Sequence, residues 1–293
     1  MSRDDDRSDP GQWTGQRRRE PIVNAPAVVV ALVVALIGVY AISQFVSIDA
    51  QDNLIGQLAF VPGRLTLAFF PNALDALRQR ANGDPDALQR AQEIRSFLYY
   101  YGGAKPWTLL TYAFLHGGWA HVGLNSVWII AFGPPVARRL GPARFLALFA
   151  ATAIAGALTH WLFNMMDFTP VIGASAADSG LMAAAARFIF EPGGPLGGSA
   201  GFSRANSVAD FNQPAPPLRR LLRERRVVMF LGVWLIANFV FGAGAKTLGF
   251  ADGPVAWLAH MGGFAMGLFG FPLFDRPSPP PSLETPLEDD AGV

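Results

Sequence analysis

Residues 25–46 read APAVVVALVVALIGVYAISQFV, an apolar run without a charged side chain. A helix needs roughly 20 such residues to cross the hydrocarbon core of a bilayer. The segment before this run is polar and rich in acidic residues, so we expect an uncleaved membrane anchor and not a signal peptide. The whole chain agrees, because 51% of its 293 residues are hydrophobic, 15% are charged and its mean hydropathy is +0.28. The sequence therefore predicts a membrane protein.

Five further stretches are apolar and long enough, or nearly so, to span a bilayer: residues 119–136, 143–163, 171–190, 227–245 and 254–274. The stretches 119–136 and 171–190 are the least apolar of the five, because each carries several polar residues. Polar side chains at membrane depth are costly and usually face a bundle interior or a water-filled cavity. The sequence predicts an all-α membrane protein, a six-transmembrane-helix bundle in which these two helices are shielded by the others.

The basic residues predict how this bundle is oriented. If the helices alternate in direction, sixteen of the 23 lysines and arginines fall on the side that holds both termini. Short cytoplasmic loops carry an excess of such residues, so both termini are expected in the cytoplasm. The compact loops and the lack of a targeting segment favour a bacterial inner membrane.

Four segments lie outside the predicted spans. The tails 1–24 and 275–293 are polar or rich in proline and acidic residues, and we expect disorder in both. Residues 191–226 are expected to form a flexible cytoplasmic loop whose basic end meets anionic lipid headgroups. In the loop between the first two spans, ALDALRQR and DALQRAQEIRSFLYYY have amphipathic helical spacing, so we expect helices on the membrane surface.

The composition also excludes several classes of function. The chain has no cysteine, so it has neither a disulfide nor a thiolate metal site, and four histidines alone make a poor zinc site. A net charge of +1, with arginines confined to short segments, argues against a nucleic-acid partner. We therefore expect no metal, no cofactor and no nucleic acid, while the lipid bilayer is an expected partner.

Polar residues in three of the stretches are candidates for chemistry. His121 and Asn125 lie one turn apart on one helical face and point together into the bundle. Pro170 and Gly173 favour extended chain that becomes helix close to Ser175. Unpaired N–H groups gather at a helix start, which suits an oxyanion that forms on an attacked carbonyl. Taken one at a time, these residues are more simply explained as polar contacts between helices or as an N-cap.

The last apolar stretch connects these candidates. Gly263 and Gly267 form a GxxxG face, which lets another backbone approach closely. The helix around Ser175 is rich in small residues and is the expected partner, so close packing would bring the His260 imidazole within hydrogen-bond reach of the Ser175 hydroxyl. A nucleophile, a base and oxyanion donors are the parts that acyl transfer needs.

Three motifs, in order, resemble those of the rhomboid family of intramembrane serine proteases. They are HGGWAHVGLN at 116–125, which resembles the second-helix signature, GAS at 173–175, which resembles the nucleophile motif, and AHMGG at 259–263 with Gly267, which resembles the sixth-helix motif. The resemblance covers the chain from about Trp107 to Phe274. It implies a rhomboid-like six-transmembrane-helix bundle whose active site opens to water on the extracytoplasmic side and cleaves transmembrane protein substrates.

The resemblance also implies a role for each motif residue. Ser175 is the nucleophile and His260 the general base, while the Ser175 N–H, His121 and Asn125 line the oxyanion hole. His116 braces the loop before the second helix. Gly173 and Ala176 flank Ser175 as supporting residues.

Three positions close to the nucleophile depart from the family's pattern. Ala176 stands where glycine usually follows the serine, which predicts modest overpacking. Ser179 stands where some members have an aromatic ring that stacks on the catalytic histidine. Asp178 is also unusual. We expect it either to pair with a polar group in the bundle or to perturb the pKa of His260.

Two other functions fit parts of the pattern. An inactive rhomboid relative that binds or escorts membrane proteins is favoured by Ala176 but opposed by the retention of Ser175 and His260. A small transporter would also have polar residues at the membrane midplane, but the sequence has no inverted repeat and no matching pair of broken helices. The sequence makes no prediction of the oligomeric state.

Overall fold

A computed structural model describes residues 25–80, 84–191, 196, 215–243 and 256–275 of the chain. The predicted tail 1–24, nearly all of the predicted tail 275–293 and most of the predicted flexible loop lie outside these residues. Within them, helices are the only regular elements, and the one β-contact is an isolated bridge between Phe60 and Val171. The predicted all-α class is confirmed for the described residues.

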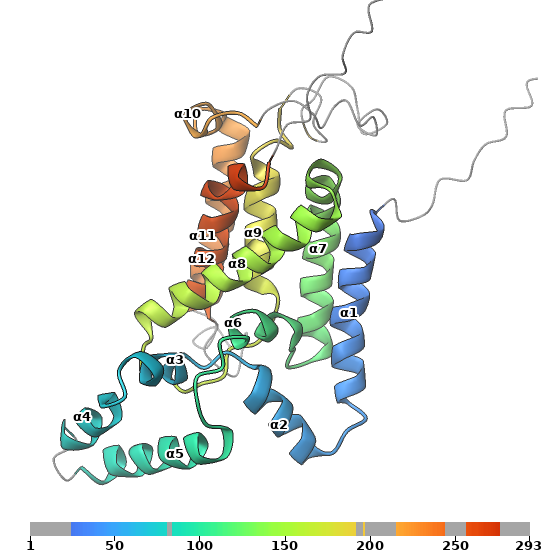
Figure 1. Ribbon diagram of the computed structural model, residues 1–293. Coiled ribbons are helices and arrows are strands. Elements are labelled where there is room, and N and C mark those ends of the chain that lie inside the picture. The colour runs from blue at the N-terminus through green and yellow to red at the C-terminus, as the bar shows by residue number, and fades with distance from the viewer. Residues whose placement is uncertain (1–24, 81–83, 192–195, 197–214, 244–255, 276–293) are drawn as a thin grey trace, which may run out of the picture.

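A helix lies in each of the six ranges that the sequence predicts to span the membrane (Figure 1): α1 (Ala27–Ser43), α7 (Trp119–Leu140), α8 (Pro142–Phe163), α9 (Ser175–Ala186), α11 (Arg225–Ala243) and α12 (Trp257–Phe269). In the described part of the chain, α8 alone is both long and apolar enough to cross a bilayer by length and composition, and α1 is a shorter apolar helix. The number of spanning helices therefore stays a prediction.

Glycine and proline set where two of these helices begin and end. α7 runs four residues beyond its predicted end although Pro134 and Pro135 lie inside it. Proline lacks an N–H and usually bends or ends a helix, yet this helix continues to Leu140. Gly141, with φ +76°, then lets the chain turn sharply, and Pro142 opens α8 at a position where no N–H is needed.

The loop between α1 and α7 is structured and gathers at one end of the bundle (Figure 1). Its elements are α2 (Ile48–Leu58), α3 (Pro62–Phe69), α4 (Ala73–Arg80), α5 (Pro85–Tyr101), α6 (Thr108–Thr111) and a 3₁₀ turn (Tyr112–Phe114). The two amphipathic segments predicted to be helical are confirmed as α4 and α5.

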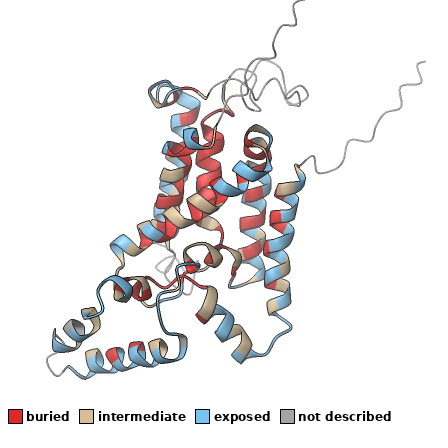
Figure 2. Cartoon of the chain, in the orientation of Figure 1, coloured by how far each residue is buried: buried red, intermediate tan, exposed pale blue. Residues whose placement is uncertain are grey.

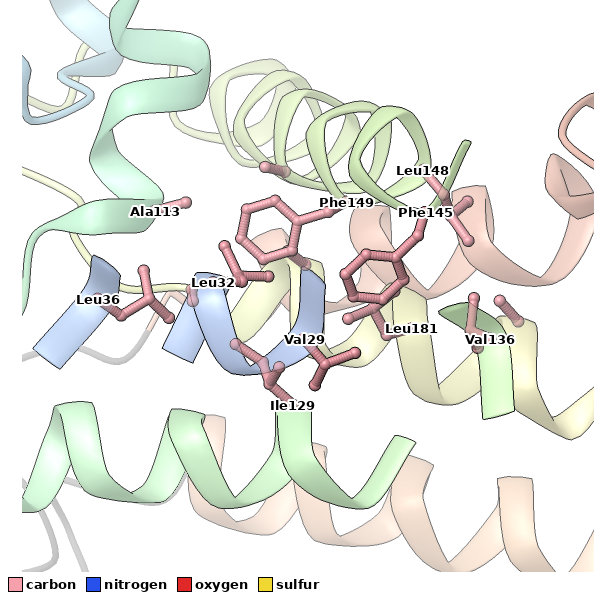
Figure 3. Close-up of a cluster of buried hydrophobic side chains, with 14 of the residues drawn as sticks. Val29, Leu32, Leu36, Ala113, Ile129, Val136, Phe145, Leu148, Phe149 and Leu181 are labelled. Atoms are coloured by element: carbon pink, nitrogen blue, oxygen red, sulfur yellow. The ribbon is translucent and has the colours of Figure 1, made fainter. Parts of the chain in front are cut away.

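α9 is the central helix of the bundle, and Figure 2 shows burial concentrated on it and on the faces turned towards it. Every residue from Ala176 to Ala186 is buried. Apolar side chains of α1, α7 and α8 pack together with Leu181 of α9, as Figure 3 shows for Leu32, Ile129 and Phe149. This cluster holds α9 from one side.

Small residues hold α9 against α12 on its other side. A methyl group on Gly263 would overlap the carbonyl oxygen of Ala176, and one on Gly267 would overlap the carbonyl oxygen of Gly180. The two backbones are therefore in direct contact, which only glycine allows at these positions. The prediction that the GxxxG face packs on the helix of Ser175 is confirmed.

The C-terminal ends of α7, α9 and α12 are tied together by two arginines. Arg139 makes a two-pronged ion pair with Asp275, with distances of 2.9 and 2.8 Å, and both side chains are buried. Arg187 donates to the Leu268 carbonyl at 3.0 Å. Asp275, predicted to begin a disordered tail, is therefore part of the packed structure, because a buried charge-assisted pair fixes it.

The basic end of the predicted flexible loop 191–226 is also more regular than expected. It contains the short helix α10 (Leu218–Leu221) and the first residues of α11. Leu221 is 1% exposed and packs with Val227 and Leu231 of α11, so an apolar side chain anchors this basic segment.

Candidate active site

Ser175 is the first residue of α9, at a helix start that is held from both sides. The chain before it is extended, since Val171 exchanges two backbone hydrogen bonds with Phe60 and the Gly173 N–H donates to the Tyr112 carbonyl at 3.0 Å. The helix was predicted to begin near Ser175, and it does, four residues later than the apolar stretch. The surface loop thereby fixes the position of the Ser175 backbone N–H, which lies in the first turn, where such groups lack intrahelical partners.

Ser175 and His260 are in direct contact. The distance between His260 Nε2 and Ser175 Oγ is 2.8 Å, across 85 residues of sequence. The contact depends on the glycine packing of α12 on α9, because His260 precedes Gly263 by one turn on α12. A serine hydroxyl that is hydrogen-bonded to a histidine nitrogen is the arrangement in which a base can take the hydroxyl proton.

The second ring nitrogen of His260 has a partner that the sequence reasoning missed. His260 Nδ1 lies 2.7 Å from Oδ1 of Asn238, on α11. Asn238 is buried. A single polar side chain within the apolar stretch 227–245 was the sequence signal that could have identified it.

His121 lies on the other side of the nucleophile segment. Its Nδ1 accepts a hydrogen bond from the Gly117 N–H at 3.4 Å, so the ring hydrogen is on Nε2. A methyl group on Gly173 would lie 2.6 Å from that Nε2, so the ring packs directly against the backbone before Ser175. Gly173 has φ +111°, which also requires glycine.

Asn125 lies at the centre of a small polar network. With its nitrogen towards Asp178, the Asn125 amide donates to Asp178 Oδ2 at 3.2 Å, and its oxygen accepts from the Ala174 N–H at 3.2 Å and from His116 Nε2 at 3.0 Å. Asp178 thus pairs with a polar group of the bundle, the first of the two possibilities that the sequence left open. An amide nitrogen has two hydrogens, so one N–H of Asn125 is used by Asp178.

His116 stands before α7, outside the helices of the bundle. Its ring meets that of His121 edge to face, with centroids 5.0 Å apart. Burial, and next the neighbouring His121, lower the pKa of His116 to about 4, against a smaller opposing effect of the Phe114 backbone. His116 is therefore neutral at pH 7, and with its hydrogen on Nε2 it donates to Asn125.

The residues that depart from the family's pattern have structural partners. Ala176 is 1% exposed, and its methyl group faces Gly156 of α8, where a Cβ would lie 2.6 Å from it. The expected overpacking is relieved because Gly156 has no side chain. Ser179 donates back to the Ser175 carbonyl at 2.8 Å, within its own helix.

Taken together, these contacts define a class: a helical protein in which a serine at a buried helix start contacts a histidine of a neighbouring helix. Among the described residues, no group of three or more histidine, aspartate or glutamate side chains could hold a metal ion.

The comparisons with known proteins identify the family. Residues 103–276, more than half of the chain, match the model of the Rhomboid domain. The chain belongs to the rhomboid family, a family of membrane proteins that includes serine proteases.

Individual relatives match over shorter regions. YdcA of Bacillus subtilis (strain 168) is 40% identical over 75 residues, 26% of this chain and 37% of that protein. Rhomboid protease GluP of the same organism is 36% identical over 78 residues, 27% of this chain and 15% of GluP. RHOMBOID-like protein 1 of Arabidopsis thaliana is 28% identical over 165 residues, 54% of this chain and 39% of that protein. The chain spans less than half the length of these relatives.

Proposed function

We propose that this protein is an intramembrane serine endopeptidase that cleaves transmembrane protein substrates through Ser175 and His260. The observation that carries the proposal is the 2.8 Å contact between His260 Nε2 and Ser175 Oγ. Membership of the rhomboid family and the name of the relative GluP support the same reaction. The retained contact also argues against an inactive relative.

In the first half of the proposed reaction, Ser175 Oγ attacks the scissile carbonyl carbon while His260 Nε2 takes its proton. An ester bond to Oγ forms as the C–N bond breaks, and His260 gives the proton to the leaving amine. In the second half, water attacks the ester carbon while His260 Nε2 takes a proton from that water. The C–Oγ bond then breaks, His260 returns the proton to Ser175 Oγ, and the peptide leaves with a new carboxyl terminus.

The carbonyl oxygen carries negative charge between these steps. The Ser175 N–H, the Nε2–H of His121 and the remaining N–H of Asn125 are the proposed donors to it. In the structure the Asn125 nitrogen faces Asp178 and its oxygen faces the Ala174 N–H, so donation by Asn125 requires the amide to rotate. Donors lower the barrier most where they are already oriented towards the developing charge. His116, Gly173 and Ala176 are proposed to support this arrangement.

Substrates are proposed to be single-span proteins of the lipid bilayer with a helix-weak segment. A regular helix buries its peptide carbonyls in hydrogen bonds, so glycine, alanine or proline near the cut would help to expose one. Ser175 is the first residue of α9 and Arg187 directly follows its last, so the site and the arginine contacts lie at opposite ends of this helix. By the excess of basic residues in the cytoplasm, the arginine end and both termini face inwards, and the site faces the extracytoplasmic side.

A cleavage assay in proteoliposomes tests this proposal. A model single-span substrate with a Gly-Ala-rich segment is incubated with wild type, Ser175→Ala, His260→Ala and the control Ser126→Ala. Ser126 is also a buried serine, but its hydroxyl donates to the Val122 carbonyl of its own helix at 2.7 Å. We expect products from wild type and the control only. Equal products from Ser175→Ala, or none from wild type, would overturn the proposal.

A further inference from the structure

We propose that Asn238 is a positioning residue that holds His260 in the one tautomer able to accept the Ser175 proton. The inference rests on the proposed function and adds a third residue to the pair. Both ring nitrogens of His260 are hydrogen-bonded, Nδ1 to Asn238 Oδ1 at 2.7 Å and Nε2 to Ser175 Oγ at 2.8 Å.

The direction of the first bond follows from the Asn238 amide. Its nitrogen faces the Trp257 carbonyl oxygen at 3.5 Å, so its oxygen faces His260. An amide oxygen only accepts hydrogen bonds, so the hydrogen of the neutral ring must be on Nδ1. Nε2 then has a free electron pair directed at Ser175.

The other tautomer would be inactive as a base. With the hydrogen on Nε2, His260 would donate to Ser175 Oγ and could not receive its proton. That tautomer would also leave Nδ1 and the Asn238 oxygen facing each other as two acceptors. Such a mismatch is costly where burial limits access to water, and the Asn238 side of this contact is 9% exposed.

Aromatic contacts on both sides of Asn238 hold α11 in register with α12. Trp234, one turn before Asn238, stacks on Phe264, one turn after His260, with centroids 4.5 Å apart and planes at 7°. On the other side, Phe239 meets Trp257 edge to face at 6.1 Å. The amide is therefore held opposite His260 by packing as well as by its own bonds.

The cost of a polar residue at this position points to the same role. The neighbouring residues Val233, Ile236 and Phe239 are exposed apolar side chains, as expected of a helix that faces lipid. Asn238 is 9% exposed and is turned away from that surface towards α12. A polar side chain inside a membrane helix is retained where it has a specific partner, and here that partner is His260.

Two substitutions separate positioning from packing. Asn238→Leu keeps the approximate volume but removes the acceptor oxygen, whereas Asn238→Asp keeps an acceptor and removes the donor to Trp257. Asn164→Leu is the matched control, because Asn164 donates to the His160 carbonyl at 3.0 Å at the end of α8. All three are made in the full chain and purified in the same detergent.

The first measurement is the rate at which a fluorophosphonate probe labels Ser175. Loss of the group that orients a metal-ligating histidine typically costs about 10- to 100-fold, and by analogy we expect a decrease of that size for Asn238→Leu. We expect Asn238→Asp to label faster than Asn238→Leu, and Asn164→Leu to label like wild type. Labelling of Asn238→Leu at the control rate would overturn the proposal.

The second measurement does not depend on activity. Nitrogen-15 NMR of histidine-labelled protein, with the His260 signals assigned by their loss in His260→Ala, reports which ring nitrogen carries the hydrogen. We expect the hydrogen on Nδ1 in wild type and a loss of this preference in Asn238→Leu. A hydrogen on Nε2 in wild type, or an unchanged tautomer in Asn238→Leu, would contradict the role of Asn238. If wild type is not labelled by the probe, the proposed protease function fails, and the NMR result still decides the role of Asn238.

Discussion

His121 and His260 are the same residue type on two sides of one serine, yet their rings are held in opposite tautomers. At His121, a backbone N–H donates to Nδ1, so Nε2 carries the hydrogen and is a donor. At His260, an amide oxygen faces Nδ1, so Nε2 is an acceptor. The partner of Nδ1 therefore decides what each ring offers to the site.

This difference assigns the two rings to different steps of the proposed reaction. A donor beside Gly173 stabilises negative charge on a carbonyl oxygen, whereas an acceptor beside the Ser175 hydroxyl takes a proton. Substitutions that keep one property of histidine and remove the other should thus affect the two positions unequally.

The largest effect is expected from removing the base. His260→Gln keeps a polar side chain of similar length but cannot take the Ser175 proton, so cleavage should fall by about 10⁴-fold or more. The measurement is the initial rate of substrate cleavage at saturating substrate. A residual rate within about tenfold of wild type would show that His260 is not the base.

A smaller effect is expected at the donor position. Loss of one oxyanion donor lowers kcat by about 10²- to 10³-fold. We therefore expect the kcat of His121→Leu to be lower than that of wild type by a factor in this range. His121→Gln retains an N–H that can donate, so it should be more active than His121→Leu. If glutamine is tolerated equally at positions 121 and 260, the distinction between donor and base is wrong.

A smaller effect on the cleavage rate is expected from the hydrogen bond between Asp178 and Asn125. Asp178→Ala removes the acceptor that holds the Asn125 amide, and an unsatisfied buried amide costs about 1–3 kcal/mol, so we expect roughly tenfold slower cleavage. Asp178→Asn can present an oxygen to the same N–H and should retain most of the activity. Equal rates for both variants would mean that Asp178 does not position Asn125.

The smallest effect on catalysis is expected where Ala176 meets Gly156. Gly156→Ala adds a methyl where the Ala176 methyl already fills the space between α8 and α9. This overpacking should lower the free energy of unfolding in detergent by about 1–3 kcal/mol. Ala176→Gly should cost about 1 kcal/mol through lower helix propensity and should not increase activity, because the methyl is already accommodated. In the double variant the two costs should be less than additive, because the clash with the Ala176 methyl is removed while the new methyl still lies 2.8 Å from the Ala259 carbonyl oxygen. Strict additivity would show that the two residues are not coupled.

The sequence predicted the elements of the fold better than their limits. Apolar stretches and amphipathic spacing located the helices, since both depend on local composition. The start of α9 at Ser175 was predicted from Pro170 and Gly173, but the ion pair of Arg139 with Asp275 was not. That pair joins residues 136 positions apart, and no local pattern reports such a contact.

For the site, motifs predicted the contact between Ser175 and His260 because the glycine spacing of α12 implied close backbone packing. Asn238 was missed because one asparagine in an apolar helix is chemically ambiguous until its neighbour is known. The partner of Asp178 was also open, since its choice depends on how α7 is rotated against α9.

The most direct test of the central claim is to map the site of a fluorophosphonate adduct by mass spectrometry in wild type, His121→Gln and His260→Gln. We expect one adduct on Ser175 in wild type, a slower adduct at the same residue in His121→Gln, and none in His260→Gln over the same time. An adduct that forms equally in His260→Gln, or that lies on another serine, would contradict it.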